Sequence, residues 1–228
     1  MPQTYRGNER GIFGYEALLT KPRMAAYIGA VCVLWECIEE MWGVILAEAL
    51  QADAKLGVDL YLALTGSAAQ GAVMTRAIEH AVQDPELRAE FGVLLASERA
   101  RAKERNRIVH GRWGVLPSRD DALVIGERNW LPKALATINH NYLKPNPAPL
   151  DIDYPVTIWT EQDFKQTLQR MDAFGLEQHK FMNRLERARH LRKQAALSES
   201  PEQAQSPQGP PARGLLSPPQ TNPEERSK

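Results

Sequence analysis

The segment RNRIVHGRWG, residues 105–114, gathers three side chains that together can act on a phosphodiester. Arg105, Asn106 and His110 fall within six consecutive residues at the expected end of a helix. Histidine can exchange a proton near neutral pH, and arginine keeps its charge while its planar fork matches phosphate oxygens. Asparagine can orient either group by hydrogen bonding. These residue types indicate metal-independent RNA cleavage, in which the ribose 2′-hydroxyl attacks the adjacent phosphate.

Two roles are open for His110 in such a reaction. A neutral imidazole would act as the general base that takes the hydroxyl proton. At the C-terminal end of a helix, however, the helix dipole favours the protonated ring. A protonated ring suits a general acid or a phosphate-binding group. The sequence therefore allows His110 to act either as the base or as the acid.

The spacing of arginine and histidine is weak evidence when taken alone. The chain has 19 arginines and five histidines, and about one arginine four to six residues before a histidine is expected from composition. Another such pair, Arg184 and His190, lies in the last helix. The context of the first pair is more specific, because asparagine follows the arginine directly and Gly111 and Trp113 follow the histidine. A motif produced by composition alone stays a third interpretation.

The segment RNRIVHGRW resembles the R-N-x-x-x-H motif of HEPN domains, a family of helical domains. The layout of residues 22–197 is also similar, with long apolar helices, the motif at the end of a later helix, and a final helix. The resemblance implies that Arg105, Asn106 and His110 form a metal-independent endoribonuclease site that needs no cofactor. It also implies a homodimer in which two motifs form one composite cleft.

Many catalytic HEPN proteins are toxins or act in anti-phage defence, so the resemblance implies RNA as the substrate and such a role for this chain. An antitoxin or regulatory protein is a further partner class that this role implies. Other members of the family have lost activity and serve as binding or dimerisation modules. A catalytically inactive module that binds a partner protein or nucleic acid is therefore the alternative hypothesis.

Basic residues surround the motif, and Arg101, Arg107 and Arg112 are the candidates for binding the RNA backbone. Residues 98–112 contain six Lys or Arg and two Glu, and residues 184–193 contain five basic residues and one acidic residue. If the two segments meet in space, they form a basic surface for phosphates. They are equally well explained as solvated helix ends whose charges complement the helix dipole.

Hydrophobic periodicity predicts an all-α helical bundle. Apolar residues recur at spacings of three and four from Pro22 to about Gln51, around most of the circumference, which is typical of a central helix or a dimer interface. Further helices are expected over 68–83, over 85–109 after the N-cap Asp84, and over 160–197, where TEQD resembles a capping box. Gly57 and the LTGS stretch are expected to interrupt the helical pattern.

Three segments lie outside this bundle. Residues 1–21 are expected to form an irregular arm, and residues 112–159 an irregular or hairpin insert in which PSRDD is the turn. Residues 198–228 are expected to be a disordered tail. Seven of the 16 prolines in the chain lie beyond position 200, and this segment has few large apolar residues.

The composition limits the classes of function. The 228 residues carry 28 basic and 28 acidic side chains, so RNA binding must rest on local charge. The longest apolar run, 24–35, is too short to cross a bilayer, and the N-terminus lacks a secretory signal. We therefore expect a cytoplasmic protein without a membrane partner. The sequence has no glycine-rich phosphate loop or metal-ligand cluster, and Cys32 and Cys37 are expected to be buried free thiols.

Overall fold

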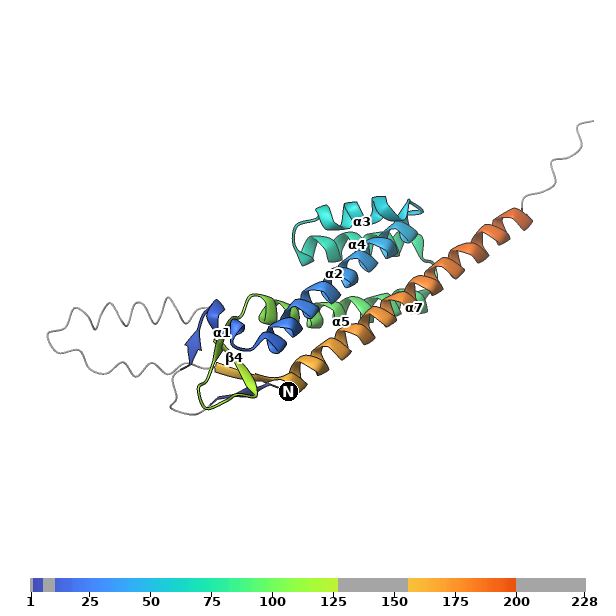
Figure 1. The fold of residues 1–228 in the computed structure, drawn as a ribbon. Helices are drawn as coiled ribbons and strands as arrows, with labels where there is room; N and C mark the ends of the chain where they lie inside the picture. Colours follow the sequence, from blue (N-terminus) through green and yellow to red (C-terminus); the bar gives the residue numbers. More distant parts are fainter. Residues whose placement is uncertain (1, 6–10, 127–155, 200–228) are drawn as a thin grey trace, which may run out of the picture. The chain divides into compact units, whose positions relative to one another are not determined.

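The computed structural model describes residues 2–5, 11–126 and 156–199 (Figure 1). The chain divides into two units, Met1–His190 and Leu191–Lys228, and the described residues of the second are the last turns of one helix. The described part is 75% helical, with six helices and a five-stranded antiparallel sheet. The helices are α1 (Tyr15–Leu19), α2 (Pro22–Leu50), α3 (Ala54–Ala63), α4 (Ser67–Ala81), α5 (Pro85–Val109) and α7 (Glu161–Glu199).

The sheet is the main departure from the all-α prediction. Its strands are β1 (Gln3–Thr4), β2 (Ile12–Phe13), β3 (Arg112–Val115), β4 (Ala122–Gly126) and β5 (Val156–Thr160), in the order β1-β5-β4-β3-β2. The predicted hairpin is confirmed as β3 and β4, with Trp113 opposite Ile125. The arm expected to be irregular supplies both edge strands. Strands of two residues carry no periodicity, and their partners lie more than 90 residues away, so no local pattern could indicate them.

Helices α2, α4, α5 and α7 match the predicted segments to within a few residues. The helix starts follow the predicted chemistry, since the Asp84 carboxylate accepts from the Glu86 N–H at 2.9 Å. The Asp163 carboxylate likewise accepts from the Thr160 N–H at 2.9 Å. Residues 127–155 of the predicted insert and 200–228 of the predicted tail lie outside the described residues.

The sequence pattern does not predict helix α3, because Gly57 interrupts it. The structure shows that this glycine is where α3 packs closely against α2. A Cβ at Gly57 would lie 2.4 Å from the Ala47 Cβ and 2.5 Å from the Gly43 carbonyl oxygen. The glycine therefore permits a close helix–helix approach inside a helix, at a small cost in helix propensity.

The core runs along the helices with alternating steps of three and four residues. On α2 it includes Trp35, Ile38 and Trp42, and Trp42 meets Phe91 of α5 edge to face at 6.0 Å between ring centroids. On α7 the buried positions after Asp163 are Phe164, Thr167, Met171, Phe174, Gln178, Phe181 and Leu185. This spacing is typical of helices that pack with interlocking side chains. Both cysteines are free, but Cys32 is half-buried and Cys37 is exposed, so the expected burial of the thiols was wrong.

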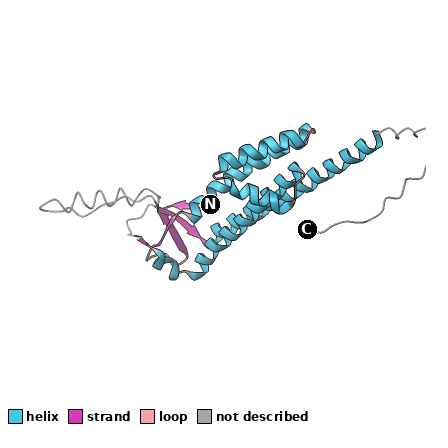
Figure 2. Cartoon of the chain, turned by 90° about the horizontal axis from the view of Figure 1, so that it is seen from above, coloured by secondary structure: helices cyan, strands magenta, loops and turns pink. Residues whose placement is uncertain are grey.

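The strands gather at one end of the helices (Figure 2), where α2 and α7 begin and α5 ends (Figure 1). Glu161 at the start of α7 accepts hydrogen bonds from Arg23 at 2.9 Å and Tyr27 at 3.0 Å, both on α2. Arg107 near the end of α5 donates to the Thr157 hydroxyl on β5. The sheet therefore packs against the end of the bundle that carries the motif. None of the described helices combines the length and apolar content needed to cross a bilayer.

Candidate functional site

The motif occupies the last turn of α5, and contacts with the sheet fix how that turn ends. His110 is the C-cap residue, and its N–H donates to the Asn106 carbonyl at 3.0 Å. The buried indole N–H of Trp113 on β3 donates to the Ile108 carbonyl at 2.9 Å. The last carbonyls of a helix lack partners within the helix, so this bond satisfies one of them inside the core.

Gly111 allows the chain to turn directly from α5 into β3. A Cβ at this position would lie 2.5 Å from the Arg107 carbonyl oxygen and 3.1 Å from Cγ2 of Ile125. The residue is not in the left-handed conformation that makes glycine common after helices, since the described glycines with positive φ are Gly14 and Gly66. Close approach of the backbone is therefore the reason for glycine here.

Arg105 is held from two sides. Its Nη1 donates to Oδ1 of Asn106 at 2.9 Å, and its Cζ lies 5.9 Å from the ring centroid of Trp35 on α2. Trp35 is only 3% exposed, so the arginine rests on a fixed aromatic surface. The Nε of Arg105 is buried and has no hydrogen-bond partner among the described residues. Arg105 is therefore half-buried, at the edge of the core.

His110 does not join this pair within the chain. Its side chain is exposed, and no hydrogen bond or ion pair connects it to another described residue. His110 lies five positions after Arg105, which places the two residues roughly 140° apart around a helix. The structure thus brings Arg105 and Asn106 together and leaves His110 on another side of the same turn.

The three arginines predicted to bind substrate lie in three different surroundings. Arg107 contacts Thr157 on the sheet, and Arg112 is exposed at the start of β3, opposite Gly126. Arg101 instead faces α7, and its Nη1 lies 3.3 Å from Oε2 of Glu104. Within the described part of the chain, neither Arg105 nor Arg107 forms an ion pair with a carboxylate. Their charges therefore remain available to an external anion.

Glu104 is the carboxylate next to the motif that sequence reasoning did not single out. It accepts from the Thr167 hydroxyl at 2.9 Å and pairs with Arg170 and Arg101. Burial alone would raise the pKa of Glu104, but the hydrogen bonds from Arg170 and Thr167 and the charges of both arginines lower the pKa below its ordinary value. Glu104 therefore links the turn before the motif to α7.

The two basic segments do not meet. Helices α5 and α7 are antiparallel, because Glu104 pairs with Arg170 while Glu90, near the start of α5, pairs with Arg184. Fourteen residues of helix separate the two arginines, which is about 21 Å. Arg189 pairs with Glu48 near the end of α2 at 2.8 Å. The basic segment of α7 thus begins at the opposite end of α5 from the motif, and acidic partners offset part of its charge.

Trp35 and Trp113 also shape this site, through contacts that the sequence did not predict. Both are tryptophans in apolar or strand-like segments, which is a signal for burial but not for a contact with a particular helix turn.

Among the described residues, no group of three or more His, Cys, Asp and Glu side chains is placed to hold a metal ion. Comparison with protein-family models, curated proteins and solved structures finds no match to this chain.

Proposed function

We propose that the protein is a metal-independent endoribonuclease with a HEPN-like helical domain, and that Arg105, Asn106 and His110 act on RNA. The observation that carries this proposal is the state of Arg105. Its guanidinium is fixed by Trp35 and Asn106 yet has no carboxylate partner among the described residues. A cation that is positioned in advance and not neutralised suits a phosphate whose charge increases in the transition state.

In the proposed reaction, the ribose 2′-oxygen attacks the adjacent phosphorus and the bond to the 5′-oxygen of the next nucleotide breaks. The products are a 2′,3′-cyclic phosphate and a 5′-hydroxyl. Arg105 stabilises the phosphorane oxygens, and Asn106 holds the guanidinium through its Oδ1. His110 either removes the 2′-hydroxyl proton or donates a proton to the leaving oxygen, and its exposed position permits both.

We further propose that two copies of the chain form the site. Arg105 and His110 point in different directions within one chain. In a dimer, the motif of the second copy would place its own His110 or Arg105 beside the residue that lacks this partner in the first copy. The outer face of α2 supports such an arrangement, because Val33 is 61% exposed and Cys37, one turn further, is also exposed. A second copy would bury this apolar surface.

The biological role that fits this activity is that of a toxin or an anti-phage defence effector in the cytoplasm, controlled by an antitoxin or another regulatory protein. This part of the proposal rests on the resemblance of residues 105–113 to the HEPN motif. The dimer and the cleavage chemistry can be tested without it.

A catalytically inactive module that binds nucleic acid or a partner protein is the second candidate. It is favoured by the absence, in the described residues, of any hydrogen bond from the His110 side chain to Arg105 or Asn106. Arg105 and Arg107 would then bind phosphates without chemistry, because binding needs only their charge.

The deciding experiment is cleavage of total cellular RNA by the purified protein in excess chelator, with RNA ends mapped by sequencing. We expect discrete cuts with cyclic-phosphate ends from the wild-type protein and none from Arg105→Ala or His110→Ala. His80→Ala is the matched control, since His80 is an exposed histidine in the last turn of α4. Light scattering reports the oligomeric state of each variant. RNA binding by folded, dimeric protein with no cuts would support the inactive module instead.

A further inference from the structure

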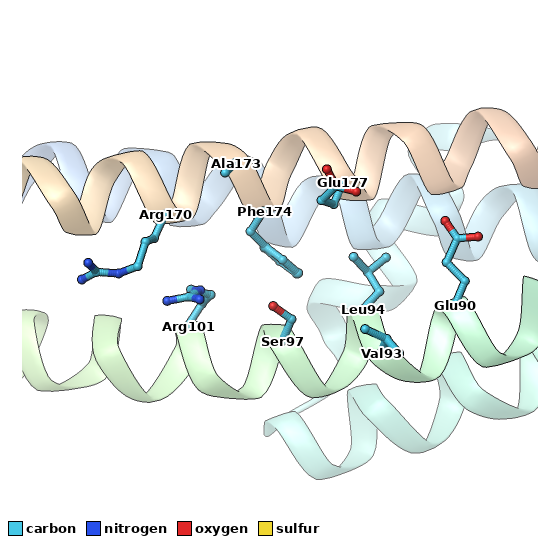
Figure 3. A pocket seen from close by; sticks show the side chains of 9 residues that line it. All are labelled: Glu90, Val93, Leu94, Ser97, Arg101, Arg170, Ala173, Phe174 and Glu177. Carbon is cyan, nitrogen blue, oxygen red and sulfur yellow. The ribbon is translucent and has the colours of Figure 1, made fainter.

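A pocket of about 340 Å³ lies between α5 and α7 (Figure 3), and the α5 residues that line it precede the motif in the helix. Its position follows from how the two helices pair. Glu90 and Glu104 lie 14 residues apart on α5. Their partners, Arg184 and Arg170, lie 14 residues apart on α7. The two ion pairs therefore hold the helices together at both ends of a segment whose middle they do not fill.

Small side chains in this segment leave the space open. Ser97 lies midway between the two glutamates on α5. Ala173 lies on α7, close to the level of Arg101 along the helix axes. Leu94 and Phe174 are 6% and 4% exposed and form the apolar floor. Neither small residue reaches across to the other helix, so the hollow is built by the sequence at these positions.

The charge around the pocket is unequal at its two ends. Glu177 pairs with Lys180 at 2.8 Å, and Glu90 pairs with Arg184, so both acidic lining residues already have a basic partner. At the end nearer the motif, Arg101 and Arg170 share one carboxylate, Glu104. This end therefore carries a surplus positive charge.

Arg101 is the donor with unused capacity. Its bond to Glu104, at 3.3 Å, is longer than a usual N–H···O hydrogen bond, and it is the only one this side chain makes among the described residues. Arginine has five N–H donors, so most of its donors point to solvent or into the pocket. Figure 3 shows both guanidinium groups projecting toward the same end of the pocket, with Phe174 between the helices.

We infer that this pocket binds a small organic anion with an apolar body. Its carboxylate or equivalent acidic group bonds to Arg101 and Arg170, and its apolar part lies on Leu94 and Phe174. The volume falls in the usual range for small-molecule pockets, which are mainly apolar with a few placed polar groups. A neutral molecule would leave the surplus charge uncompensated, and an organic cation would be repelled by it. This binding does not depend on the proposed ribonuclease activity.

Binding is tested by calorimetric titration of the full chain with decanoate, with decanol as the neutral analogue. We expect saturable binding of decanoate and binding of decanol that is about tenfold weaker or more, because charge-assisted hydrogen bonds are lost. Arg101→Gln should weaken decanoate binding by a similar factor. Arg76→Gln is the matched control, since Arg76 also pairs with a glutamate three residues later, on α4, and should leave binding unchanged.

A second variant tests the position of the ligand independently of charge. Ser97→Leu fills the hollow from α5 and should abolish binding of decanoate while both arginines remain. Circular dichroism and thermal unfolding verify that each variant is folded. The inference is overturned if the folded wild-type protein shows no saturable binding of decanoate, or if Arg101→Gln and Ser97→Leu bind decanoate as tightly as the wild type. RNA cleavage plays no part in these readouts, so failure here leaves the proposed function unaffected.

Discussion

The guanidinium of Arg105 lies over the indole ring of Trp35, with Cζ 5.9 Å from the ring centroid. Trp35 belongs to the buried stripe of α2, and Arg105 is in the last turn of α5. The contact keeps a charged side chain at the edge of the core without a carboxylate, because the ring offers electrostatic attraction that does not neutralise the charge. The aromatic stripe of one helix thus positions the motif of another.

This contact predicts a measurable coupling between the two residues. In a double-mutant cycle of Trp35→Leu and Arg105→Gln, we expect a coupling energy of about 0.5–2 kcal/mol in urea unfolding. Trp35→Phe keeps an aromatic face and should retain most of the coupling, while both Trp35 variants lose core packing. A coupling energy near zero in both cycles would show that the ring only fills space.

The hydrogen bond from Trp113 to the end of α5 predicts an asymmetry between two neighbouring tryptophans. Trp113 and Trp159 meet edge to face at 6.0 Å, but the buried indole N–H of Trp159 has no partner among the described residues. Trp113→Phe leaves the Ile108 carbonyl unsatisfied and should destabilise the protein by about 1–3 kcal/mol more than Trp159→Phe does. Faster amide exchange at His110 would locate the effect. Equal costs would mean that the bond contributes nothing.

The close approach of α3 to α2 predicts opposite effects of alanine at two helical glycines. Gly57→Ala places a Cβ 2.4 Å from that of Ala47, which no rotamer can relieve, and should cost about 1–3 kcal/mol. Gly92 in α5 has nothing within 4 Å of the added Cβ, so Gly92→Ala should stabilise by up to about 1 kcal/mol. Urea unfolding checks both. Stabilisation by Gly57→Ala would show that α3 can shift at little cost.

The network at Glu104 predicts stability that is lost in acid. The pKa of Glu104 is lower in the folded protein than in the unfolded chain. The contribution of Glu104 to folding stability is therefore complete at pH values above the ordinary glutamate pKa, and it is lost as the pH falls through the lowered pKa of the folded state. Glu104→Gln should therefore cost about 1–3 kcal/mol at pH 7 and nothing at strongly acidic pH. Glu79→Gln breaks a well-exposed pair on α4 and should change little at either pH.

Glu98 predicts the opposite dependence. It is 7% exposed on the buried stripe of α5, and burial, together with the charge of Glu39, raises its pKa despite the nearby Arg99. The folded state then binds the proton more tightly, so wild-type stability falls as pH rises above the ordinary glutamate value. Glu98→Gln should be more stable than the wild type at pH 7, and the difference should vanish in acid. An unchanged difference across this range would contradict the assigned cause.

Local patterns in the sequence determined most of the helices and one contact in the site. Steps of three and four predicted α2, α5 and α7, because burial repeats with the helix period and needs no knowledge of the partner. The hairpin of β3 and β4 followed from two short apolar segments on either side of the turn PSRDD. Arg105 and Asn106 are adjacent in sequence, so the motif alone allows a hydrogen bond between their side chains to be predicted.

The tertiary structure decided what depends on residues far apart in the chain. It placed Trp35 under Arg105, turned Arg101 toward α7, and separated the basic segments by making α5 and α7 antiparallel. It also converted Gly57 from an expected break into a packing point and added two edge strands to the sheet. These outcomes depend on helix register and direction, which side-chain periodicity leaves undetermined, because one buried stripe can face several partners equally well.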